Sequence, residues 1–177
     1  MRRRKALKQM IFVAGSAIFL PYCWQNSRNS SLLLKHIAID TDIEKMLLGL
    51  SETIIPTTET PGAKEVSAHI FALVMVDDCY KKEDQQQFIL GLKAFQNNCN
   101  SQFGKSFTNL SATEKETFLH GLEIGKPTDV ALAYFYKNFK KLTIQAYTSS
   151  KYYLTKVQVY ELVPGNFHGC VPLKSII

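Results

Sequence analysis

The chain has 177 residues, of which 46% are hydrophobic, and a formal net charge of +6. Most of that charge precedes Cys23, at Arg2, Arg3, Arg4, Lys5 and Lys8, so the remainder of the chain is close to neutral. This distribution excludes an extended basic surface of the kind that binds nucleic acid, and the length beyond Cys23 is enough for one domain with a hydrophobic core.

Residues 1–22 have the organisation of an export signal. The charged start contains Arg3, Arg4, Leu7 and Lys8, and a short apolar run follows over residues 11–20. This run is about half of the ~20 residues that a helix needs to cross a bilayer core, so it does not predict a permanent span. The order Arg-Arg-x-x-Leu-Lys resembles a twin-arginine signal, which exports proteins after folding. An ordinary secretory signal and a retained anchor are the alternatives.

Cys23 directly follows this segment and resembles the lipidation site of a bacterial lipoprotein. The fit is imperfect because Tyr22 and Pro21 stand where a small residue is usual. We expect Cys23 to be lipidated and residues 23–38 to form a polar spacer that holds the domain off a membrane surface. The expected location is therefore periplasmic, with a tether to the membrane.

Residues 39–177 predict a single all-α domain, a bundle of about five helices with an irregular, extended C-terminal arm. The first helix begins at Asp40 or Thr41, carries a continuous apolar stripe and ends before Pro56. A second is predicted over residues 63–80, although its apolar middle, 70–76, is also compatible with a buried strand. A third begins at Lys82 and is followed by a loop at residues 97–104.

Two further helices follow. Ser111 and Glu114 form a capping-box pattern for the fourth, and Asp129 is the expected cap of a long fifth helix. After Ser150 the β-branched and aromatic residues of 152–160 predict an extended segment, which is followed by a turn at 163–166.

Three cysteines remain if Cys23 is acylated. The simplest arrangement in an oxidising compartment is one bridge and one free thiol, and we favour a Cys79–Cys170 disulfide. A Cys79–Cys99 bridge is the second choice, and three buried, reduced thiols are the third.

The sequence lacks the motifs of a catalytic or cofactor-binding chain. It has no Gly-rich dinucleotide fingerprint, no haem-attachment motif and no His-Glu-x-x-His zinc motif. The acidic pairs at residues 77–78 and 83–84 are expected to be solvated helix ends. We therefore expect no catalytic residue, cofactor or metal in this chain.

Three stretches carry a resemblance to a known family, in addition to the twin-arginine start. They are Ser51-Glu52-Thr53-Ile54-Ile55-Pro56-Thr57-Thr58-Glu59-Thr60-Pro61-Gly62-Ala63 with Met75-Val76-Asp77-Asp78-Cys79-Tyr80, and the tail from Val163 to Pro172. This pattern resembles the small (third, or gamma) subunit of gluconate 2-dehydrogenase-like complexes, especially the forms found in Bacteroidetes.

The resemblance implies a role for the chain in a complex. In such complexes a large FAD-containing subunit of the GMC oxidoreductase type oxidises a sugar or sugar acid, and electrons leave through a cytochrome c subunit or another acceptor. The small subunit carries no cofactor and is similar to an export escort that stabilises the flavin subunit.

The expected contact surface lies in the 57–63 loop and the 152–172 arm, although both segments could instead cover this domain's own core. The residues concerned are Thr57, Thr58, Pro61, Tyr152, Tyr153, Tyr160 and Phe167. A different class of function is a free-standing lipoprotein that binds a small ligand in its bundle, in a pocket lined by Tyr134 and Phe135. An enzyme in its own right is a third alternative.

Overall fold

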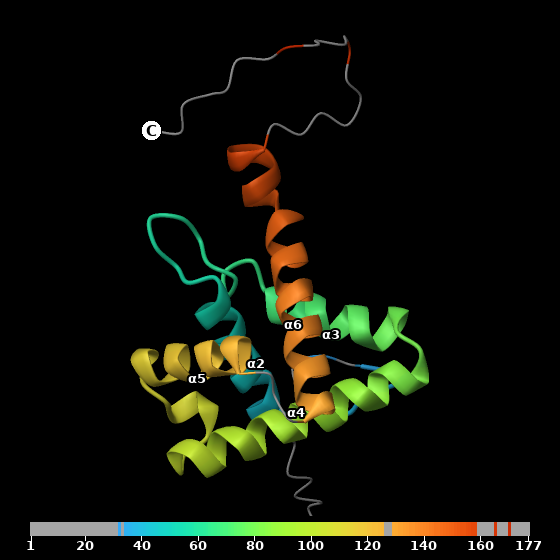
Figure 1. The fold of residues 1–177 in the computed structure, drawn as a ribbon. Helices are drawn as coiled ribbons and strands as arrows, with labels where there is room; N and C mark the ends of the chain where they lie inside the picture. The colour runs from blue at the N-terminus through green and yellow to red at the C-terminus, as the bar shows by residue number, and fades with distance from the viewer. Residues whose placement is uncertain (1–31, 33, 126–128, 159–164, 166–169, 171–177) are drawn as a thin grey trace, which may run out of the picture.

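The computed structural model describes residues 32, 34–125, 129–158, 165 and 170. Within them the chain is helical and contains no strand, so the predicted all-α class is confirmed (Figure 1). The elements, in chain order, are α2 (Thr41–Ile54), α3 (Ala68–Cys79), α4 (Lys82–Phe103), η1 (Phe107–Asn109), α5 (Ala112–Ile124), α6 (Val130–Thr148) and η2 (Tyr153–Val157).

The predicted starts of α2, α5 and α6 are confirmed, because they depend on local chemistry. The Asp40 side chain accepts the backbone N–H of Ile43 at 2.8 Å, and Asp129 accepts that of Ala131 at 2.8 Å. Ser111 and Glu114 make both bonds of a capping box, in which each side chain accepts the backbone N–H of the other residue.

Helix α6 is the centre of the bundle and packs against α4, α3 and α2. The core of the bundle contains an aromatic cluster, in which neighbouring ring centroids lie 5.0–6.2 Å apart. The rings are those of Phe88, Phe95, Phe107, Phe118, Phe135 and Phe139. Edge-to-face pairs of this kind stabilise a core beyond their buried area. A Cβ atom at Gly91 would lie 2.0 Å from the carbonyl oxygen of Ala131, so α4 and α6 cross at backbone contact.

Two predicted helix boundaries were wrong. The second helix begins at Ala68 rather than at residue 63, because residues 63–67 form turns and Ser67 adopts a left-handed backbone, with φ of 54°. The third helix continues to Phe103 through the predicted loop, and Gly104, with φ of 65°, ends it. The polar 97–103 stretch stays helical because Cys99 is buried on the same face as Phe95.

The predicted extended segment was also wrong over its described part. Lys151 and Tyr152 are helical, and residues 153–157 form one π-helical turn, η2. The rings of Tyr147 and Tyr153 pack edge to face with centroids 6.0 Å apart, which holds this turn on the end of α6. Aromatic and β-branched residues favour strands only where a sheet is available to pack against, and the described residues contain none.

The remaining predictions for the ends of the chain lie outside the described residues. These are the signal residues Arg3, Arg4, Leu7 and Lys8, the lipidation site Cys23, and the arm residues Tyr160 and Phe167.

Candidate partner-binding surface

The loop between α2 and α3 is a tightly hydrogen-bonded structure. The Glu65 carboxylate accepts the backbone N–H of Gly62 at 2.5 Å. The Thr57 hydroxyl has two carboxylate acceptors within reach, Glu52 at 2.9 Å and Glu65 at 3.1 Å. The backbone N–H of Ala63 donates to the carbonyl of Ile55 at 2.9 Å, which closes the base of the loop. A Cβ atom at Gly62 would lie 2.6 Å from the backbone nitrogen of Thr57, so only glycine fits there.

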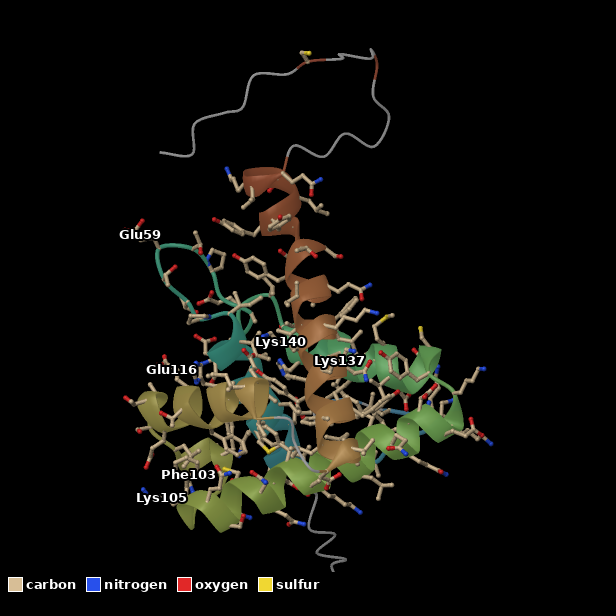
Figure 2. The ribbon with its side chains drawn as sticks, in the orientation of Figure 1. Glu59, Phe103, Lys105, Glu116, Lys137 and Lys140 are labelled. Atoms are coloured by element: carbon tan, nitrogen blue, oxygen red, sulfur yellow. The ribbon has the colours of Figure 1, made fainter. Side chains whose placement is uncertain are left out.

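The outer part of this loop is turned toward solvent. Thr57 and Thr58 are exposed and Pro61 is half-buried. Glu59, at the tip, points away from the body of the molecule (Figure 2). The loop therefore combines a fixed backbone with exposed side chains, an arrangement that suits recognition of another surface.

The base of the loop packs on the last turns of α6. Ala63 and Ala68 form a small buried cluster with Ala146, and Ile55, Val66 and Phe71 pack around it. Tyr152 and Tyr153, which follow α6, are both half-buried. The structure thus brings five of the predicted interface residues to one end of the molecule, which we call the loop end (Figure 1): Thr57, Thr58, Pro61, Tyr152 and Tyr153.

Asp77 has a structural role that the sequence analysis missed. The expectation that the Asp77–Asp78 pair is solvated was wrong for Asp77, which is only 3% exposed. Its carboxylate accepts the backbone N–H groups of Lys35, His36 and Ile37 at 2.7, 2.7 and 2.9 Å. Burial raises the pKa of Asp77, but the three backbone hydrogen bonds outweigh burial and hold its pKa below the usual range.

This contact, which we call the Asp77 clamp, fixes the segment that leads into the domain. Gln85 supports it, because its side-chain amide donates to the backbone carbonyls of Val76 at 3.1 Å and Asp77 at 2.8 Å. Ile37, held by the clamp, contributes to the core. The one available sequence signal was register, because Asp77 is adjacent to the buried Val76 and four residues after the buried Leu73.

Burial and hydrogen bonding occupy the side chains that the ligand-binding alternative would use. Phe135 is fully buried among Phe88, Phe95 and Phe139. The hydroxyl of Tyr134 donates to Asp84 at 3.1 Å, and burial with this bond raises the pKa of Tyr134 to about 12. Neither residue lines the hollow beside α4.

A second polar cluster links α5 and α6. The Glu123 carboxylate accepts the Tyr136 hydroxyl at 2.7 Å and forms an ion pair with Lys140 at 2.5 Å. The hydrogen bonds from Lys140 and Tyr136 lower the pKa of Glu123, whereas burial and Glu123 raise that of Tyr136. These groups satisfy one another, so the cluster is a structural tie.

The described cysteines are free thiols. Cys79 and Cys170 are exposed, so the disulfide predicted between them is not formed in this structure. Cys99 is buried, and its thiol donates to the carbonyl of Lys105 at 3.6 Å.

Two further findings concern the described part of the chain alone. No three His, Cys, Asp or Glu side chains come together there in a way that could hold a metal ion. None of its helices has the length and apolar character needed to span a membrane.

One comparison with known proteins gives a match. The family model described as gluconate 2-dehydrogenase subunit 3 matches residues 42–165, from the start of α2 to the arm beyond η2. No curated protein gives a significant match. No solved structure does so either.

Proposed function

We infer the function of this chain from its family. The chain belongs to the gluconate 2-dehydrogenase subunit 3 family, because the match covers more than half of it. We propose that it is the non-catalytic small subunit of an oxidoreductase complex. The family's name describes one subunit among others of a dehydrogenase. Catalysis is then the work of a partner, for which we propose a GMC-type flavoprotein that carries FAD and oxidises a sugar or sugar acid. A cytochrome c subunit is the proposed electron acceptor.

The arrangement of the loop end is the structural observation that supports this role. A hydrogen-bonded loop with exposed threonines and two half-buried tyrosines lie together at the C-terminal end of α6. Tyrosine supplies a large contact area with little loss of conformational entropy, and a preorganised backbone reduces the cost of association. We propose that this end binds the flavoprotein, in an interface of at least ~1,200 Å² as expected for a stable complex.

The export signal predicted for residues 1–22 supports a second part of the proposal. A flavoprotein that takes up FAD in the cytoplasm crosses the membrane in a folded state. A small subunit with a twin-arginine signal at Arg3 and Arg4 would escort it, and lipidation at Cys23 would then hold the complex at the periplasmic face of the membrane.

The test is to express the flavoprotein with and without this chain, and to measure exported dehydrogenase activity and FAD content. The proposal predicts that both fall when the chain is absent, and that a chain with Arg3→Lys and Arg4→Lys gives the loss of export without the loss of FAD. Equal export and equal FAD content in all three cases would contradict it.

A further inference from the structure

A second surface, distant in sequence from the loop end, has the properties of a docking groove. It is a hollow of about 640 Å³ between α4 and the segment that the Asp77 clamp holds. Its lining residues are His36, Ile37, Ala38, Lys82, Gln85, Gln86, Ile89, Leu90 and Lys93. We call it the α4 groove.

The groove has an apolar floor. Leu90 is 56% exposed, although it is a large hydrophobic residue within a long helix, and the half-buried Ile89 lies beside it. Ile37 and Ala38 form the opposite wall. An exposed leucine by itself requires no explanation, but a leucine that lines a hollow together with other apolar side chains marks a binding surface.

The rim of the groove carries positive charge and no carboxylate. Lys82 and Lys93 lie eleven residues apart on the same face of α4, which separates them by roughly 16 Å along the axis. Both are exposed, and neither has an ion-pair partner in the part of the chain that the structure describes. Glu83 and Asp84 belong to the same turn as Lys82 but do not line the groove, and Asp84 accepts the hydroxyl of Tyr134.

The clamp makes the groove a preformed site. His36 and Ile37 donate their backbone N–H groups to Asp77, so the wall opposite α4 is held in place before any partner arrives. Asp77 thus acts as a positioning residue, since its carboxylate touches the backbone of the wall and not the space of the groove. A fixed wall reduces the conformational entropy lost on binding.

We propose that the α4 groove receives an acidic, apolar-faced segment of the oxidoreductase partner, a proposal that rests on the function inferred above. An apolar side chain of the partner packs on Leu90 and Ile89, and its carboxylates pair with Lys82 and Lys93. A protein segment fits better than an anionic membrane, because a segment can enter the hollow between α4 and residues 36–38, whereas a flat bilayer follows only its rim. The complex is then held at two places, the loop end and the α4 groove.

The test uses the full chain co-expressed with its flavoprotein, and a double variant with Lys82→Glu and Lys93→Glu. Reversal of both charges should weaken the complex by about tenfold or more at low salt, and the difference should shrink as salt is added. The matched control reverses two exposed lysines of α6, Lys137→Glu and Lys141→Glu, which changes the net charge equally (Lys137 is labelled in Figure 2). The control should stay within about twofold of the unmodified affinity.

A photo-crosslinking residue in place of Leu90 gives an independent readout, because that chain retains both lysines. It should crosslink to the flavoprotein at a segment that contains Asp or Glu. The groove proposal alone would be overturned if the complex forms, its affinity is unchanged by the double charge reversal, and residue 90 gives no crosslink. Absence of any complex would overturn it together with the proposed function.

The membrane alternative is a further outcome of the same experiment. If the double variant loses binding to phosphatidylglycerol vesicles while its complex with the flavoprotein is unchanged, the groove is a lipid site and the proposal is wrong.

Discussion

The carboxylate of Asp77 accepts the backbone N–H of Ile37 at 2.9 Å, across 40 residues of sequence. Two more backbone groups donate to the same side chain, so one buried charge satisfies three donors. We expect Asp77→Asn to lower the free energy of unfolding by about 2–4 kcal/mol, because it removes the charge and leaves a donor group facing donors. Urea denaturation of the chain measures this loss.

Asp78→Asn is the matched control for that prediction. Asp78 pairs with Lys35 at 3.1 Å, but both side chains are well exposed, and exposed pairs contribute little. We expect a change of less than about 0.5 kcal/mol. If Asp77→Asn and Asp78→Asn lower the free energy of unfolding by similar amounts, the clamp stabilises the fold no more than an exposed ion pair does.

The clamp also predicts a pH dependence of stability. The pKa of Asp77 is lower in the folded chain than the usual value of about 3.9 for an unfolded aspartate. Its contribution is therefore fully present above that value and is lost as the pH falls through the folded pKa. The gap in stability between the unmodified chain and Asp77→Asn should narrow as the pH falls from about 5 to 2. Two parallel curves over that range would contradict the assignment.

Local features of the fold were predictable from the sequence, and long-range ones were not. The caps at Asp40, Ser111 and Asp129 depend on side chains within three residues of the groups they bind. The role of Asp77 depends on partners that lie 40–42 residues away, which a reading along the chain cannot bring together.

The candidate site shows the same division. The Pro-Gly pair and the threonines around it predict a loop, but the hydrogen bonds of Glu65 that give the loop its shape follow from its three-dimensional arrangement. The polar composition of residues 97–104 predicts a loop. Burial of Cys99 keeps residues 97–103 helical, and that burial depends on the packing of α4 against the rest of the domain.

Two helical glycines should respond in opposite ways to the same substitution. A Cβ atom at Gly91 would lie 2.0 Å from the Ala131 carbonyl oxygen and 2.5 Å from the Phe135 Cβ, whereas nothing lies within 4 Å of one at Gly121. We expect Gly91→Ala to destabilise the chain by about 3 kcal/mol or more, since α4 and α6 must separate. Gly121→Ala should stabilise it by about 0.5–1 kcal/mol, because alanine favours a helix. Thermal melting measures the change in Tm of each variant, and equal changes would refute the close crossing of α4 and α6.

The three described thiols should differ in reactivity. Burial raises the pKa of the Cys99 thiol, so little thiolate is present near neutral pH, and its sulfur is also inaccessible. Cys79 and Cys170 are exposed. Maleimide labelling followed by peptide mass spectrometry should modify those two in the folded chain, and Cys99 only after denaturation. If Cys79 and Cys170 become reactive only after reduction, the disulfide predicted from the sequence forms after all.

The shape of the loop end should matter more to the complex than to the domain itself. Glu65→Ala removes the acceptor of the Gly62 N–H and one of the two acceptors of the Thr57 hydroxyl, which also faces Glu52 at 2.9 Å, so the loop is held less firmly. Because these bonds lie at or near the surface, we expect the isolated chain to lose only about 0.5–1.5 kcal/mol of stability. Binding to the flavoprotein should weaken by about tenfold, because the partner must then order the loop.

Glu116→Ala on α5, which also removes one exposed carboxylate (Figure 2), should leave the affinity unchanged. An affinity that is insensitive to Glu65→Ala would mean that the ordered loop is not part of the interface.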